Sequence, residues 1–175
     1  MLFRHDPPPS RVAERFRSGD GVFTVAADGG VQVVRVATSL EHSVDLLHAL
    51  AEHLPPLVDC SIECVRTKRR YVGEGLSLPE VRDAVARLKV PLVASGGVEL
   101  AVYTDEDQLV LDPMLELWIY SRTDRWVYLL VGAGLEVVET VPRRSWRVAR
   151  DEFTGGRELV DAVETPAERL TLRLV

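Results

Sequence analysis

Two stretches of this chain each begin with a hydroxyl residue followed three positions later by glutamate, and each continues into an apolar stripe. The first reads Thr38-Ser39-Leu40-Glu41 and the second reads Ser77-Leu78-Pro79-Glu80. Both patterns predict a capping box, in which the hydroxyl accepts a bond from the glutamate amide and the glutamate side chain accepts one from the hydroxyl residue's amide. The stripes recur at helical spacing: Leu40, Val44, Leu47, Ala51 and Leu54, then Val81, Ala84, Val85 and Leu88. The sequence therefore predicts two amphipathic helices.

Elsewhere the apolar residues recur with a period of two, which indicates strands. Segments 22–27 and 31–37 flank Asp28-Gly29-Gly30 and predict a hairpin, because a tight turn needs positive φ. Residues 58–64 alternate as a half-buried strand. The pattern also allows the strand to continue to residue 72, and Gly73-Glu74-Gly75 is expected to break it. From Val90 onward the alternation persists, and it predicts strands at 98–103, 108–111, 114–120, 125–131 and 135–141.

This order of segments predicts an α+β fold: a mostly antiparallel mixed sheet with two or three helices packed on it. The late strands are joined by short polar turns, so they are antiparallel neighbours, since a parallel crossover needs a dozen residues or more. We expect a further helix at 157–164 and an edge strand through residues 170–174. Pro7-Pro8-Pro9 stiffens an N-terminal arm that leads to a short helix at 10–17. The expected organisation is thus an arm over 1–20 and a single domain over 21–175.

Composition limits the class of protein. The chain has 175 residues, 46% of them hydrophobic, and a formal net charge of −6. It is hydrophobic enough to build a core and too hydrophobic for a disordered chain. The acidic balance argues against wholesale nucleic-acid binding, although it allows a local basic patch. With no signal-peptide pattern and no apolar run near 18 residues, we expect a soluble, cytoplasmic protein without a membrane partner.

The cysteines and the basic residues add to this expectation. Cys60 and Cys64 lie in one predicted strand, about 13 Å apart, which is too far for a disulfide. They are typical of small core residues in a reducing compartment. All of the 21 basic residues except Lys68 and Lys89 are arginine, which is typical of a GC-rich genome. We therefore expect a bacterial cytoplasm.

Four aromatic residues are candidates for binding a partner. Alternation places Trp118 and Tyr120 on one side of predicted strand 114–120, and Trp126 and Tyr128 on one side of predicted strand 125–131. The opposite sides are apolar too. Either helices cover both faces, or one aromatic face is open to a partner, for which Trp and Tyr are favoured anchors.

Two basic clusters are candidates for binding an anion. One holds Arg66, Lys68, Arg69 and Arg70 beside Tyr71, and the other holds Arg143, Arg144, Arg147 and Arg150 around Trp146. Basic residues interleaved with aromatic ones can bind phosphates and stack on bases. Ser77 follows a glycine-containing loop at a predicted helix N-terminus, where free amides attract an anion. The alternative is that none of these residues binds an anion: the first cluster is then a charged strand face, the second a solvated loop, and Ser77 a plain helix cap. The sequence does not show whether the two clusters adjoin.

Catalytic and metal motifs are absent from the sequence. It contains no P-loop, no nucleophile elbow, no H-E-x-x-H and no C-x-x-C. Glu41, Asp45, His48 and Glu52 form a stripe on the first helix, but a metal site of that type needs a second helix with matching ligands, so a solvated face is expected.

The leading hypothesis is a non-catalytic protein-interaction module of a bacterial cytoplasm: a regulatory, adaptor or immunity-type protein whose partner is another protein. One alternative is a protein that binds an anionic ligand, a nucleotide or nucleic acid, through the two arginine clusters. The other alternative is an enzyme whose active site cannot be seen in the sequence. We expect no catalytic residue, no metal and no cofactor.

Overall fold

The structure, a computed structural model, describes residues 21–141 and 156–175. Its strands are β1 (Gly21–Asp28), β2 (Val31–Thr38), β3 (Leu57–Cys64), β4 (Arg69–Ser77), β5 (Val98–Tyr103), β6 (Asp107–Leu111), β7 (Leu117–Ser121), β8 (Glu136–Val137) and β9 (Arg173–Leu174). The helices of the described ranges are α2 (Leu40–Ala51), α3 (Leu78–Ser95), α4 (Arg125–Gly132) and α5 (Gly156–Arg169). The nine strands form one sheet in the order β8-β1-β2-β7-β6-β5-β3-β4-β9, antiparallel except at the β1–β8 pair. The predicted α+β fold is confirmed, with four helices in the described ranges where two or three were expected.

The first hairpin and the helix after it follow the sequence closely. Gly29 and Gly30 have φ of 56° and 85° and close the β1–β2 turn, as expected. The cap of α2 begins one residue later than predicted: Ser39, not Thr38, accepts the hydrogen bond from the His42 amide, at 3.2 Å. Thr38 is still paired with Gly21 across the hairpin, so its backbone belongs to the sheet and cannot begin a helix.

The segment after α2 contains two strands, whereas the sequence allowed a single long strand that continues to residue 72. β3 ends at Cys64, the chain turns back, and β4 pairs antiparallel with β3. Lys68 takes the positive φ of 57° in this turn, and its amide donates to the Cys64 carbonyl at 2.8 Å. No glycine or proline signals the turn in the sequence. The predicted break at Gly73-Glu74-Gly75 is also wrong, because these residues lie inside β4.

Helix α3 runs further than its predicted stripe. Ser77 is its N-cap residue, but the side chain makes no capping bond. The expected residues Val81, Ala84, Val85 and Leu88 are buried. The helix continues past Pro91 to Ser95, where the sequence predicted alternation from Val90 onward. Leu92 extends the buried stripe by one turn, which supports a helix despite the proline.

Three predicted strands differ in the second half of the sheet. β5 and β6 match the prediction, but β7 begins at Leu117, not at Met114. The predicted strand at 125–131 is wrong: this segment is helix α4, which buries Trp126 and Leu130 on one side, four residues apart. Only Glu136–Val137 of the predicted strand at 135–141 pairs, beside β1.

The C-terminal segment closes the other edge of the sheet. The expected helix is present as α5 and the expected edge strand as β9, which pairs with β4 at Tyr71 and Val72. Leu172 lies against Gly73 so closely that a Cβ at this glycine would stand 2.5 Å from the leucine Cδ2. The predicted arm and short helix at 1–20 lie outside the described residues.

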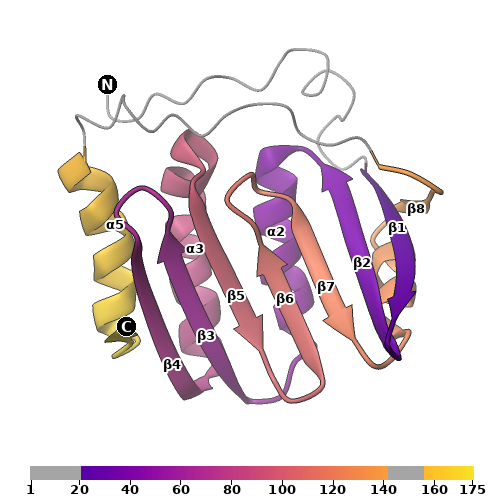
Figure 1. The fold of residues 1–175 in the computed structure, drawn as a ribbon, viewed down its shortest axis with the longest axis horizontal. Coiled ribbons are helices and arrows are strands. Elements are labelled where there is room, and N and C mark those ends of the chain that lie inside the picture. The colour runs from indigo at the N-terminus through magenta and orange to yellow at the C-terminus, as the bar shows by residue number, and fades with distance from the viewer. Residues whose placement is uncertain (1–20, 142–155) are drawn as a thin grey trace.

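The helices all pack on one face of the sheet. Figure 1 shows α2 and α3 behind the strands, the orange α4 behind β1 and β2, and α5 at the left edge beside β4, where it contacts α3 and β3. The strand residues that point toward them belong to one continuous core that extends from Phe23 to Leu170. We call the opposite side of the sheet the helix-free face, because no helix of residues 21–141 or 156–175 covers it. None of the helices in these ranges is long and apolar enough to cross a bilayer.

Candidate functional site

Three aromatic side chains lie on the helix-free face, and we call them the aromatic row: Tyr103, Trp118 and Tyr120. Trp118 lies opposite Val110, so it is offset along the strands from the other two. Tyr120 on β7 pairs with Gln108 on β6, which pairs with Tyr103 on β5. Leu117 and Ile119 are fully buried toward the helices, so the intervening Trp118 and the following Tyr120 point to the helix-free face. Tyr103, Trp118 and Tyr120 are all partly exposed. The structure thus brings two of the four predicted partner-binding residues, Trp118 and Tyr120, onto one surface.

Trp118 is held by charged neighbours. The Arg35 guanidinium lies 5.3 Å from the centre of the indole ring and forms a two-bond ion pair with the Glu116 carboxylate, with both bonds at 2.9 Å. The indole Nε1 donates to Asp112 Oδ2 at 3.3 Å. Asp112 Oδ1 in turn accepts from the amides of Met114 and Glu116. This network fixes the orientation of Trp118.

Carboxylates lie beside the aromatic row on the same face. Glu63 and Glu99 stand directly opposite one another on β3 and β5, and Arg70 on β4 is opposite Glu63. Burial raises the pKa of Glu99, and the negative charges of Glu63 and Asp112 raise it further. Burial also raises the pKa of Asp112. The cluster of Glu63, Glu99 and Asp112, which we call the acidic cluster, therefore holds negative charge that Arg70 only partly balances.

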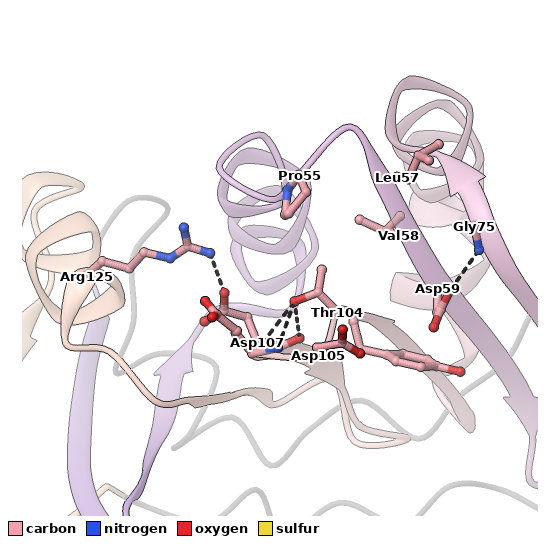
Figure 2. A pocket seen from close by; sticks show the side chains of 11 residues that line it. Pro55, Leu57, Val58, Asp59, Gly75, Thr104, Asp105, Asp107 and Arg125 are labelled. Atoms are coloured by element: carbon pink, nitrogen blue, oxygen red, sulfur yellow. Dashed lines mark hydrogen bonds and ion pairs between the residues drawn. The ribbon is translucent and has the colours of Figure 1, made fainter.

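A pocket of about 460 Å³ opens at the end of the strands (Figure 2), and Tyr103 of the aromatic row is among its lining residues. Pro55, Leu57 and Val58 form its apolar side, and Tyr103 and Asp59 belong to both the pocket and the helix-free face. Its other lining residues come from the β5–β6 turn, the end of β4 and the start of α4: Gly75, Thr104, Asp105, Glu106, Asp107 and Arg125. We call this the strand-end pocket. Its volume suits a small organic group.

Asp107 joins the pocket to helix α4. Its carboxylate is almost fully buried and accepts hydrogen bonds from Trp126 Nε1 at 2.7 Å and from the Ser121 hydroxyl at 2.5 Å. Arg125 forms an ion pair with the other oxygen and lies over the Trp126 ring, 4.6 Å from its centre. These bonds satisfy both oxygens of Asp107 and hold α4 against the sheet.

The other two predicted partner-binding residues lie away from the helix-free face. Trp126 has no exposed surface because it packs in the core and donates to Asp107. Tyr128 is 69% exposed, but it belongs to α4, one of the helices packed on the opposite face of the sheet. The sequence placed both on a strand, and the helix rotates them onto different sides.

The residues of the first basic cluster contact different parts of the structure. Arg66 donates to the Gly96 carbonyl at 2.7 Å, and burial lowers its pKa. Arg69 pairs with Glu164 of α5, while Arg70 lies opposite Glu63. Lys68 lies in the β3–β4 turn. These four residues do not converge on one site.

The predicted anion site at Ser77 already has an internal anion close by. The Gly75 amide, near the end of β4, donates to Asp59 Oδ1 at 2.8 Å, so a carboxylate of the chain itself already accepts from the backbone just before α3 (Figure 2). The second basic cluster, with Arg143, Arg144 and Arg147, lies outside the described residues.

No group of three or more His, Cys, Asp or Glu in the described ranges is arranged to hold a metal ion. Cys60 and Cys64 are free thiols in the core, as the sequence predicted, and burial raises the pKa of Cys60 to about 12. Searches against protein-family models, curated proteins and solved structures find no match to this chain.

Sequence reasoning missed several residues that now define the site: Arg35, Asp59, Glu63, Glu99, Tyr103 and Asp112. They come from four different segments that the sheet brings together, namely β2, β3, β5 and the β6–β7 connection, and each alone is an ordinary polar residue of a strand or turn. Strand alternation could have assigned each residue to a face. It could not have shown that the strands carrying them are neighbours.

Proposed function

We propose that this protein is a non-catalytic protein-interaction module, a regulatory, adaptor or immunity-type protein, and that its partner binds on the helix-free face. The observation that supports the proposal is the aromatic row of Tyr103, Trp118 and Tyr120 on the side of the sheet opposite the helices. We further propose that it acts in the bacterial cytoplasm, where thiols such as Cys60 and Cys64 stay reduced.

The physical basis is the chemistry of interface anchors. Tyr and Trp carry a large apolar ring and a polar tip, and they are enriched among the residues that dominate binding energy. Trp118 is already oriented by Arg35 and Asp112, so binding does not have to order this side chain. Less conformational entropy is then lost on association.

The test compares two tyrosine variants in affinity capture from the native lysate. Tyr120→Arg places a long charged side chain on the helix-free face, whereas the matched control Tyr128→Arg changes an exposed tyrosine on the helix-covered side. We expect a protein that is retained by the wild type and by Tyr128→Arg and lost with Tyr120→Arg. Circular dichroism of both variants checks that each is folded.

Two outcomes would contradict the proposal. One is a retained protein that both variants bind equally well. The other is a wild-type chain that recovers nothing beyond background across several lysates and several salt concentrations.

A further inference from the structure

We infer that the segment of the partner that binds on the helix-free face is basic, with lysine or arginine side chains directed at the acidic cluster. The inference rests on the proposed function and adds the chemistry of the partner to it. It depends on the arrangement of carboxylates around the aromatic row.

The first observation is an unfavourable pair of like charges. Glu63 and Glu99 lie directly opposite one another on neighbouring strands, a placement that normally destabilises a sheet. Burial and the nearby charges of Glu63 and Asp112 raise the pKa of Glu99, and Arg70 only partly offsets this effect. A cation placed between the two carboxylates would relieve the repulsion.

The second observation is the position of the acidic cluster relative to the aromatic row. Asp112 of the acidic cluster accepts a hydrogen bond from Trp118 Nε1 at 3.3 Å, so the cluster and the aromatic side chains are in direct contact. Burial raises the pKa of Tyr120, and the charges of Glu99 and Asp112 raise it further. A lysine or arginine side chain could therefore place its charged end at the carboxylates and its apolar stem on the tyrosine ring. The tyrosine ring itself also attracts a cation.

The third observation is the negative charge at the end of the aromatic row. Asp59 and Tyr103 line the strand-end pocket, together with the exposed Asp105 and Glu106. A basic partner segment that follows the row would have carboxylates beside it along the acidic cluster and again at the pocket. Charge complementarity of this kind speeds association and discriminates against the wrong partners.

The same charges disfavour the other occupants. A second copy of this chain would bring together two proteins of formal net charge −6 and two copies of the acidic cluster. Nucleic acid would place phosphates against Glu63, Glu99 and Asp112. A protein segment rich in lysine or arginine is the occupant that complements this face.

The experiment measures binding of three synthetic octapeptides to the full chain by fluorescence anisotropy. The peptides alternate valine with lysine, with serine or with glutamate, so that only the charge of the probe changes. The first variant is the double substitution Glu63→Gln and Glu99→Gln. Its matched control, Glu41→Gln with Glu168→Gln, removes two exposed carboxylates from α2 and α5 on the helix-covered side.

We expect the lysine peptide to bind the wild type and to lose affinity as salt is raised, because exposed charges are screened. The Glu63→Gln, Glu99→Gln variant should bind it about five-fold to ten-fold more weakly, the size expected when two partly exposed ion pairs are lost. The control variant should bind within about two-fold of the wild type. Tyr120→Arg should weaken binding as well, because it adds positive charge to the face.

The outcomes separate the two proposals. In one outcome the serine peptide binds as tightly as the lysine peptide, and Tyr120→Arg abolishes the binding of both peptides. The helix-free face is then an interaction surface without preference for cations, and only the present inference fails. If no peptide binds, or if the control variant weakens binding as much as the Glu63→Gln, Glu99→Gln variant, the inference also fails. The proposed function is then decided by the capture experiment with Tyr120→Arg.

Discussion

At the scale of single residues, Glu99 shows a conflict between folding and charge. Its side chain is partly buried on β5, faces Glu63, and lies near Asp112. A carboxyl group with a raised pKa in the folded state is one whose charged form the fold disfavours. Charges that are kept at some cost to stability are common where a surface serves binding.

The direction of the pKa shift gives a testable pH dependence. The folded-state pKa of Glu99 lies above its unfolded value. The native state therefore keeps its full stability below about pH 4.3, the ordinary glutamate pKa, and becomes less stable as pH rises through the folded-state pKa. Glu99→Gln should therefore raise the free energy of unfolding at pH 7 by about 0.5 kcal/mol, a value reduced for solvent screening. The gain should disappear in acid.

Urea unfolding at pH 7 and near pH 4 measures this difference. Glu168→Gln, on the exposed surface of α5, is the control and should change little at either pH. If Glu99→Gln destabilised the protein at pH 7, the repulsion between Glu99, Glu63 and Asp112 would not be the dominant effect at this position.

At the scale of secondary-structure elements, α4 depends on one buried carboxylate. Asp107→Ala would leave the indole of Trp126, the hydroxyl of Ser121 and the guanidinium of Arg125 without their shared acceptor. Leaving buried donors and a cation unpaired should cost about 3 kcal/mol of stability. The loss can be measured by urea unfolding followed by tryptophan fluorescence. Asp105→Ala, at an exposed neighbouring position, should stay within about 0.5 kcal/mol of the wild type, and equal losses in the two variants would contradict this role for Asp107.

The element scale also shows what the sequence could and could not predict. Helices α2, α3 and α5, the first hairpin and strands β3, β5 and β6 were predictable because cap, period and turn residues agree locally. Segment 125–131 was not, because a short apolar run fits a strand and a helix equally well. In the helix, Trp126 donates to Asp107, which lies 19 residues earlier in the sequence, a contact that no local pattern contains. The β3–β4 turn was missed because Lys68, not glycine, takes the positive φ.

Sequence patterns contain only local information, and this also explains which residues of the site could be predicted. Trp118 and Tyr120 were identified because alternation along one strand is a local property. The partners that orient Trp118 come from β2 and from the β6–β7 connection, so no local pattern could reveal them. Trp126 was placed on the same surface because its segment was assigned to a strand. Assigning a residue to a common surface requires the sheet order, which single-sequence patterns do not contain.

At the scale of the whole molecule, sequence-distant segments share one core. β1 and β8 close one edge of the sheet, and β4 with β9 closes the other (Figure 1). A single cluster of buried side chains connects Phe23 of β1 with Trp126 of α4 and Val163 of α5. Because the helices of residues 21–141 and 156–175 cover only one face, one layer of buried side chains serves both halves of the sheet: β1, β2, β7 and β8 in one half, and β3, β4, β5, β6 and β9 in the other. The halves should therefore not unfold independently.

Cooperative unfolding of the two halves is the prediction that belongs to this scale. Tryptophan fluorescence reports on β7 and α4 through Trp118 and Trp126 in a Trp146→Phe background, and alkylation of Cys60 and Cys64 reports on β3. Both thiols are buried and the pKa of Cys60 is raised to about 12, so they react only when the core opens. The two probes should give the same urea midpoint and slope, as a two-state transition requires. Cysteines that became reactive well below the midpoint of the fluorescence transition would mean that the half containing β3 opens first, and the single domain expected over 21–175 would have to be divided.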